Sequence, residues 1–268
     1  MSDDEGSGPV DAHANGPLPP VDVLVRTANS ARTLESALAP ARRWLPVHRF
    51  IVVDRASTDD TQAIAKRYGA EIYVDEVGIG RATHWALELA DTELVLFLDS
   101  DVTLRRPDFY CEALRAIARP GVGAVVGTPV GHSFLYGLPL GLTLLPRTWA
   151  LGVTIPPEAQ GAETYFFRQQ LRRDRRRIAY VPNAMDHRSP YRGRHWPEWQ
   201  GAQIRRSAGW SPRELTYSLL VVLLIHANSH SARNLAYTPV FYLKLLRGFM
   251  DPQRWWMRDR RFLPPEES

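Results

Sequence analysis

Short apolar runs alternate with segments that carry apolar residues at helical spacing through the first half of the chain. Residues 21–25, 50–53, 71–74 and 93–98 are short and mostly apolar, which predicts buried β-strands. Apolar residues recur every three or four positions over 34–45, between the first two of these runs, which predicts a helix. Strands and helices that alternate at such short intervals predict an α/β fold, in which helices cover both faces of a mostly parallel sheet.

The pattern weakens in the second half of the chain. Helices are expected over 107–118 and 161–171, and short strands over 123–126 and 178–182. Residues 131–160 are rich in Gly, Pro, Leu and Trp and have little periodicity. We expect loops and short elements there, shaped for a ligand rather than for a plain core.

Changes in composition divide the chain into three parts. Residues 1–19 are acidic and rich in Gly and Pro, with no aromatic residue, which predicts a disordered tail. Residues 20–190 hold the alternating strands and helices. Residues 191–268 are rich in Arg and Trp and contain two apolar segments near 215–227 and 236–249, which predicts a helical extension.

Bulk properties narrow the class of protein further. The chain has 268 residues, a formal net charge of +4 and one cysteine, so an internal disulfide framework is excluded. The sequence pI is about 9.4, which favours contact with phosphate or an anionic surface without requiring nucleic acid. No signal peptide is recognisable, and no stretch reaches the roughly 20 apolar residues needed to span a bilayer. We expect a cytoplasmic protein, soluble or peripheral at the inner face of a membrane.

Two carboxylates follow the fourth apolar run. Asp99 and Asp101 are one residue apart in Asp-Ser-Asp, and they can converge once the strand ends. Hard oxygen ligands at a strand end, where open α/β sheets bind their ligands, favour a divalent cation that holds a diphosphate. The alternative is that the tripeptide only ends the strand and caps the next helix.

The other predicted strands also have polar residues at their ends. Thr27 and Asn29 follow the first strand, Asp54 follows the second, and Gly80 and Arg81 precede the fourth. Because the carboxyl ends of parallel strands share one sheet edge, these residues together predict a ligand-binding cleft.

These motifs, taken in order, resemble the GT-A glycosyltransferases, in particular the inverting enzymes of family two. The resemblance covers about residues 20–130. It is carried by Val25-Arg26-Thr27-Ala28-Asn29, Val52-Val53-Asp54 with Ser57-Thr58-Asp59, Gly78-Ile79-Gly80-Arg81-Ala82 and Phe97-Leu98-Asp99-Ser100-Asp101.

The resemblance implies a donor in which a sugar is linked to a nucleoside diphosphate. Thr27 and Asn29 would belong to the nucleotide-sugar pocket, with Thr27 at the base or ribose, and Asp54 would hydrogen-bond the edge of the base. Arg55-Ala56 departs from the Asp-Gly that is frequent in the family. This departure leaves the choice between a UDP-linked and a GDP-linked donor open.

The same resemblance implies a phosphate and metal site. Arg81 would approach the diphosphate, which suits its fork of hydrogen-bond donors. Asp99 would bond the ribose or the sugar. Asp101 would coordinate Mn²⁺ or Mg²⁺, and His187 falls where some GT-A enzymes place a further metal ligand, although a lone His after a strand is also a common structural residue.

Glu163 is the candidate catalytic base. Many family members carry Gly-Glu-Asp before a helix, whereas this chain has Gly161-Ala162-Glu163-Thr164. Glu163 could deprotonate the acceptor hydroxyl. The alternative is a helix-start residue favoured by the helix dipole, with another carboxylate as base or a retaining mechanism.

Basic residues outside the motifs suggest two further surfaces. Residues 172–177 contain five Arg and are interpreted as a solvated helix end rather than a nucleic-acid site, because no nucleic-acid fold motif accompanies them. Trp and Arg alternate beside the apolar segments of residues 191–268, a pattern that fits a membrane interface as well as helices packed on the catalytic domain.

The sequence thus predicts a metal-dependent glycosyltransferase that acts on an acceptor hydroxyl, on a glycan or a lipid-linked acceptor near a membrane. A polyprenyl-phosphate sugar synthase, whose acceptor is a phosphate, is the close alternative. A non-catalytic protein that binds a membrane surface or nucleic acid is the alternative from another class. A nucleotidyltransferase is disfavoured because no Gly-rich phosphate loop followed by Lys lies near the first strand.

Overall fold

A computed structural model describes residues 16–129, 138–155, 163–187, 195–228 and 231–256. Residues 1–15 of the expected tail over 1–19, and the first two residues of the Gly-Ala-Glu-Thr motif, lie outside the described residues. The elements of the α/β part are β1 (Val21–Thr27), α1 (Leu34–Trp44), β2 (Val47–Asp54), α2 (Thr61–Arg67), β3 (Glu71–Val74), α3 (Ile79–Leu89), β4 (Leu94–Leu98), β5 (Val102–Leu104), α4 (Phe109–Ile117), β6 (Val122–Pro129), β7 (Leu142–Pro146), α5 (Arg147–Leu151), α6 (Glu163–Arg173) and β8 (Arg177–His187). Four helices follow, namely α7 (Trp196–Ala208), α8 (Pro212–Asn228), α9 (Ala232–Met250) and α10 (Pro252–Trp256).

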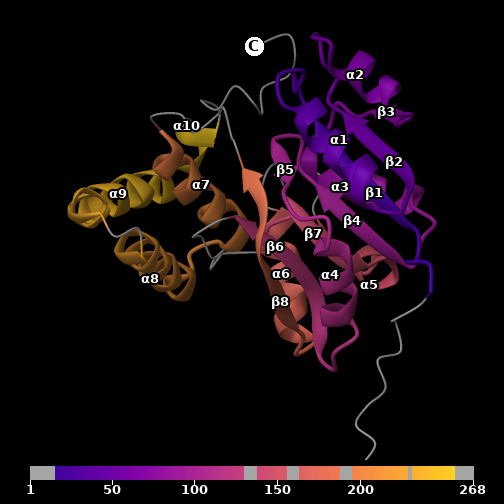
Figure 1. Cartoon of the computed structure of the whole chain (residues 1–268). Helices are drawn as coiled ribbons and strands as arrows, with labels where there is room; N and C mark the ends of the chain where they lie inside the picture. The colour runs from indigo at the N-terminus through magenta and orange to yellow at the C-terminus, as the bar shows by residue number, and fades with distance from the viewer. Residues whose placement is uncertain (1–15, 130–137, 156–162, 188–194, 229–230, 257–268) are drawn as a thin grey trace, which may run out of the picture.

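The strands form one sheet in the order β3-β2-β1-β4-β7-β6-β8-β5 (Figure 1). Strands β3, β2, β1 and β4 are parallel to one another, as the sequence predicts. Strand β7 runs antiparallel to both β4 and β6, and β5 runs antiparallel to β8. The first four strands therefore end at the same edge, where the Asp-Ser-Asp turn lies.

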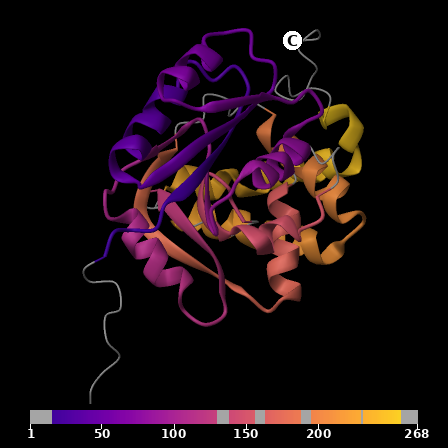
Figure 2. The same ribbon diagram turned by 90° about the vertical axis from the view of Figure 1, so that its right-hand side faces the viewer.

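Alternate residues of the central strands face two separate hydrophobic cores. Val23 and Val25 pack with α1, α2 and α4 on one face, whereas Leu24 packs with α3, α5 and α6 on the other. This two-sided burial explains why the strands read as continuous apolar runs. Helices lie on both sides of the sheet in Figure 2, which confirms the expected α/β class with a helical extension.

Strand β7 corrects the expectation of ligand-shaped loops over 131–160. Leu142, Leu144 and Leu145 are fully buried, and β7 lies between β4 and β6 in the middle of the sheet. Its five residues are too few to show a clear period, and its antiparallel direction follows from long-range pairing that local sequence does not encode. Of the expected region, 130–137 and 156–162 lie outside the described residues.

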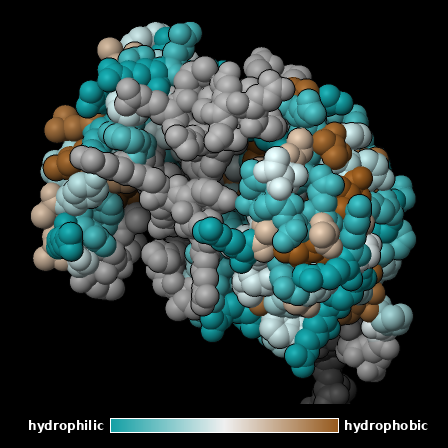
Figure 3. All heavy atoms as spheres, turned by 90° about the horizontal axis from the view of Figure 1, so that it is seen from above, coloured by the Kyte–Doolittle hydropathy of each residue, from teal (hydrophilic) through white to brown (hydrophobic). Residues whose placement is uncertain are grey.

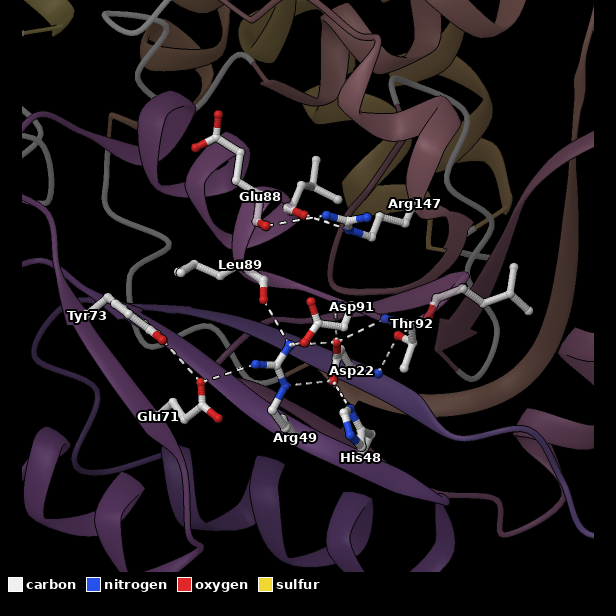
Figure 4. A network of polar contacts seen from close by, with 12 residues as sticks. Asp22, His48, Arg49, Glu71, Tyr73, Glu88, Leu89, Asp91, Thr92 and Arg147 are labelled. Atoms are coloured by element: carbon white, nitrogen blue, oxygen red, sulfur yellow. Dashed lines mark hydrogen bonds and ion pairs between the residues drawn. The ribbon is translucent and has the colours of Figure 1, made fainter.

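A charged network closes the opposite edge of the sheet (Figure 4). Asp22, at the start of β1, is fully buried and accepts hydrogen bonds from Arg49, His48 and the backbone N–H groups of Asp91 and Thr92. Arg49 also donates to the carbonyl of Leu89 at the carboxyl end of α3. Because buried charge is tolerated only when it is paired and hydrogen-bonded, this network fixes how β1, β2 and α3 meet.

The last four described helices pack on one another around a small core of their own. Ile204, Val222, Phe241, Leu245 and Phe249 form this core between α7, α8 and α9. Helices α7 and α9 cross at Gly201 and Gly248, where an added Cβ on either glycine would overlap a backbone carbonyl of the other helix. Among the described residues, no helix is both long and apolar enough to cross a membrane.

Candidate active site

Arg26, the sixth residue of β1, is the centre of the candidate site. Strands β1 and β4 pair in parallel with Leu24 opposite Phe97, so Arg26 and Asp99, each two residues further on, meet on the same side. One guanidinium nitrogen, Nη2, lies 2.6 Å from Asp99 Oδ1, and the other, Nη1, lies 2.9 Å from Glu163 Oε1. Nη1 also donates to Thr83 Oγ1 of α3. Arg26 therefore joins the Asp-Ser-Asp turn to the first residue of α6.

The two carboxylates that Arg26 contacts differ in their surroundings. Glu163 is buried, with 4% of its surface exposed, whereas about a third of the Asp99 side chain is exposed. Burial raises the pKa of Glu163 by more than the charge of Arg26 lowers it. Burial would lower the pKa of Arg26, but the charges of Asp99 and Glu163 raise it above its ordinary value. Arg26 therefore stays charged between the two carboxylates.

One oxygen of Glu163 has no hydrogen-bond partner within the part of the chain that the structure describes. Its Oε1 accepts from Arg26, but its Oε2 is buried and has no partner among the described residues. A buried carboxylate oxygen without a partner is costly, because it has lost its hydration without replacement. This oxygen is thus suited to accept a hydrogen bond from a bound hydroxyl.

Thr27 and Asp54 lie side by side at the ends of β1 and β2, where they are paired in the sheet register. Thr27 Oγ1 donates to Asp54 Oδ1 at 2.6 Å. The fully buried Asp54 also accepts from the Ser57 N–H and hydroxyl and from the Gln62 amide. Both oxygens of Asp54 thus already have protein partners that hold the loop after β2 in shape.

The loop after β1 is tied to two neighbouring loops. Asn29 has a φ of 47°, in the left-handed region, and its Oδ1 accepts from the Thr58 N–H. The Ser30 and Ser100 hydroxyls lie 2.9 Å apart, which joins this loop to the Asp-Ser-Asp turn. The loops after β1, β2 and β4 are therefore joined to one another by hydrogen bonds, and together they form the floor of the candidate site.

Asp101 and His187, the two residues predicted as metal ligands, lie next to each other. Strand β5 pairs with the end of β8, which brings His187 Nε2 to 3.3 Å from Asp101 Oδ1. Both side chains are partly exposed. Within the described ranges, no group of three or more His, Cys, Asp or Glu side chains could hold a metal by itself. A cation here would need further ligands besides Asp101 and His187, and a bound phosphate could supply some of them.

Arg81 lies in the first turn of α3, because this helix begins at Ile79. Its Nε lies 3.3 Å from Asp75 Oδ1, and its guanidinium stacks 5.4 Å from the ring centroid of Trp85. About half of the Arg81 side chain is exposed. Among the residues that the structure describes, no hydrogen bond or ion pair joins Arg81 to the carboxylates of the Asp-Ser-Asp turn, so its approach to a diphosphate stays a prediction.

Sequence reasoning did not assign Arg26 a function, although it lies inside one of the quoted motifs. The available signal was a single cation between Val25 and Thr27, at the end of a strand that the structure buries along its whole length. Such a residue needs a charged partner in the fold. Its partners lie 73 and 137 residues away in sequence, which no local pattern reveals.

Comparison with known proteins finds a family model that matches part of this chain. Residues 22–139 match the model of glycosyl transferase family 2. An uncharacterized glycosyltransferase of Mycobacterium bovis and one of Mycobacterium tuberculosis are each 34% identical to this chain over 90 residues. The match covers 33% of this chain and 39% of each relative, so the aligned region spans about two fifths of those proteins.

Solved structures agree on the fold. Glucosyl-3-phosphoglycerate synthase from Mycobacterium tuberculosis, in complex with Mn²⁺, UDP and phosphoglyceric acid, superposes with a TM-score of 0.53 and 21% identity. The match covers 64% of this chain and 71% of the synthase. The same synthase with Mg²⁺ and UDP also gives a TM-score of 0.53. At this identity the likeness shows the fold alone.

The family match runs from β1 to the residues just before β7, and it includes Arg26, Asp54 and the Asp-Ser-Asp turn. His187, Glu163 and the last four helices lie beyond it. The family model thus matches residues 22–139 of this chain, and the α/β fold is similar to that of the GT-A glycosyltransferases.

Proposed function

We propose that this protein is a metal-dependent glycosyltransferase that moves a sugar from a nucleoside diphosphate to an acceptor hydroxyl. The observation that carries the proposal is the pair of contacts made by Arg26. It links Asp99, on the side of the predicted sugar donor, to Glu163, on the side of the predicted acceptor. A fold that only binds a nucleotide has no need to connect these two carboxylates through one buried cation.

The sugar donor would lie across the floor formed by the loops after β1, β2 and β4. Thr27 and Asn29 shape the nucleoside pocket, and Asp54 would reach the base only by exchanging one of its present hydrogen bonds. Asp99 Oδ1 is held by Arg26, and its exposed part is available to the ribose or the sugar. UDP- and GDP-linked donors are both compatible with these contacts.

Asp101 and His187 suit Mn²⁺ or Mg²⁺. A carboxylate oxygen and an imidazole nitrogen within 3.3 Å of each other are ligands that Mn²⁺ accepts, and the diphosphate would complete the shell. When bound, such a cation neutralises the charge that develops on the leaving nucleoside diphosphate. The complexes of the synthase with UDP and either Mn²⁺ or Mg²⁺ support this choice of cofactor at the level of the fold.

Glu163 is the proposed general base. Its free Oε2 would accept the proton of the acceptor hydroxyl while the hydroxyl oxygen forms the new bond to the anomeric carbon. The bond from that carbon to the diphosphate breaks on the opposite face, so the configuration is inverted. Arg26 keeps Glu163 Oε1 in place and favours its ionised form.

The acceptor is proposed to be a glycan or a lipid-linked molecule near a membrane. Support comes from the exposed apolar faces of α8 and α9, which would bring the enzyme to a lipid surface. A polyprenyl-phosphate acceptor would need no base, because its nucleophile is already an anion. Glu163→Gln therefore separates the two acceptors, since it would slow transfer to a hydroxyl far more than transfer to a phosphate.

Sugar-donor hydrolysis and transfer, measured with UDP- and GDP-sugars in the presence and absence of Mn²⁺, test the proposal. Asp101→Ala should abolish the metal-dependent activity. Asp108→Ala removes an exposed carboxylate paired with Arg106 and should leave the activity unchanged. Full metal-dependent activity in Asp101→Ala would refute the assignment of this carboxylate.

A further inference from the structure

Exposed apolar side chains are concentrated on the helical extension. Among the described residues, 13 large hydrophobic side chains are exposed, and nine of them lie between Trp210 and Met250. Those on α8 are Leu220, Leu223 and Leu224, and those on α9 are Leu235, Tyr237, Val240, Leu243 and Met250. Figure 3 shows hydrophobic residues gathered along the edge of the molecule that these helices form. Clusters of this kind mark interaction surfaces rather than ordinary solvent-facing helices.

The spacing shows that each helix has a second apolar face. On α9, Val240, Leu243 and Met250 recur at helical intervals, while Phe241, Leu245 and Phe249 on the other side fill the core shared with α7 and α8. The two helices lie antiparallel, because the Tyr242 hydroxyl donates to the carbonyl of Leu215 and His226 contacts Thr238. The exposed apolar side chains of α8 and α9 thus do not take part in the core that holds the helical extension together.

The exposed charged side chains of α8 and α9 are all positive. The only acidic residue in α8 and α9 is Glu214, which is buried between α6 and α8, 3.2 Å from Arg168. Arg213, Arg233 and Arg247 are exposed. An apolar helix face flanked by arginines, with Asp251 as the exposed acid at the end of α9, is complementary to the acyl chains and anionic headgroups of a lipid surface.

Two other features agree with a surface-lying helix pair. Trp210, in the turn between α7 and α8, is 63% exposed, and its indole is of the kind that settles at headgroup level. Helices α8 and α9 have 17 and 19 residues, and α9 contains Pro239, so neither qualifies as a membrane span. Against a second copy of the chain, the exposed arginines would face like charges across a two-fold axis.

We infer that the outward faces of α8 and α9 dock this protein onto an anionic lipid surface. The inference adds a binding surface to the proposed transfer reaction and does not depend on it. Leu224 and Leu243 would enter the interface, while Arg213 and Arg233 would contact headgroup phosphates. Binding should therefore need both anionic lipid and the apolar face, and it should weaken as salt screens the arginines.

Cosedimentation of the full chain with vesicles tests this inference. We expect binding to vesicles that contain phosphatidylglycerol and much weaker binding to pure phosphatidylcholine. Leu224→Glu/Leu243→Glu should weaken binding at least about tenfold, since two charged side chains would have to enter the interface. Arg213→Gln/Arg233→Gln should lower affinity for the anionic vesicles only.

Val74→Glu is the matched control, because Val74 is as exposed as Leu224 (48% each) but lies on β3. It should bind vesicles as the wild type does. Equal vesicle binding by the double Leu variant, or no binding by the wild type, would overturn the inference. A concentration-dependent dimer in light scattering that the double Leu variant abolishes would instead assign the face to a second copy. Because no nucleotide is present, these outcomes leave the metal-dependent transfer of the sugar untested and bear only on whether the acceptor lies near a membrane.

Discussion

Arg26 Nη1 donates a hydrogen bond to Glu163 Oε1 at 2.9 Å and thereby joins the end of β1 to the start of α6. Both side chains are buried, and 137 positions of sequence separate them. A contact of this kind is strong because charge-assisted hydrogen bonds gain strength in a site from which water is excluded. The contact couples the proposed base to Arg26, in the half of the chain that is proposed to bind the nucleotide.

The pH profile of activity should show the effect of Arg26 on Glu163. Glu163 must be ionised to act as a base, so kcat/KM should rise with pH through its pKa. Burial raises this pKa above the ordinary 4.5. The rise of kcat/KM on the acidic side of the wild-type pH profile, called here the acidic limb, should therefore lie above pH 4.5. Arg26→Met removes the charge that lowers the pKa, and the limb should move to still higher pH.

Arg26→Lys should restore part of the wild-type profile, because it returns the charge without the two-pronged geometry. Arg49→Met is the matched control, since Arg49 holds a buried carboxylate at the opposite sheet edge. It should lower stability without moving the acidic limb. An unshifted limb in Arg26→Met would show that Glu163 is not the titrating base.

Glu163→Gln should lower kcat for transfer to a hydroxyl by about 10²–10⁴-fold, the usual contribution of a general base. The amide keeps the shape of the side chain, so the affinity for the nucleotide should stay close to that of the wild type. Rapid-quench kinetics and nucleotide titration measure the two quantities separately. Loss of nucleotide affinity with an intact chemical step would contradict the assigned role.

The buried network around Asp22 should dominate the acid sensitivity of folding. Burial tends to raise the pKa of Asp22, but hydrogen bonds from Arg49, the Asp91 N–H, His48 and the Thr92 N–H lower it below the ordinary 3.8. A depressed pKa gives stability that is present above pH 3.8 and is lost as the pH falls through the folded-state value.

Asp22→Asn should therefore lower the free energy of unfolding by about 2–3 kcal/mol at neutral pH. Below pH 4, the free energy of unfolding of this variant should change less with pH than that of the wild type. Asp91→Asn removes an exposed partner of the same Arg49 and should cost at most about 1 kcal/mol. Denaturant titrations at several pH values compare the two. Equal losses would show that burial of Asp22 contributes nothing.

The crossing of α7 and α9 should tolerate no side chain. A Cβ at Gly201 would overlap the backbone carbonyl of Leu245, which cannot swing aside as a flexible side chain can. Gly201→Ala should cost about 2 kcal/mol or more and loosen the helical extension. Gly16→Ala, where a Cβ meets no atom within 4 Å, is the control. Hydrogen exchange of α9 amides would locate the effect, and unchanged protection in Gly201→Ala would contradict it.

The parallel half of the fold was predictable because each of its strands is a short apolar run that ends in polar residues. The placement of Thr27 beside Asp54 followed from the same rule, since adjacent parallel strands end together. Strand β7 and the partners of Arg26 were not predictable. Both depend on pairing across long stretches of sequence, which local periodicity does not record.

Binding of Mn²⁺ in the presence and in the absence of nucleotide tests whether Asp101 and His187 hold the metal. In electron paramagnetic resonance, the signal of free Mn²⁺ should fall when the wild-type protein and UDP or GDP are present together, and it should fall much less without nucleotide. Asp101→Ala and His187→Ala, which remove the two side chains that meet at 3.3 Å, should leave most of the Mn²⁺ free. If both variants retain Mn²⁺ as the wild type does, the metal site does not lie between β5 and β8, and the proposed role of Asp101 and His187 in metal-dependent transfer is wrong.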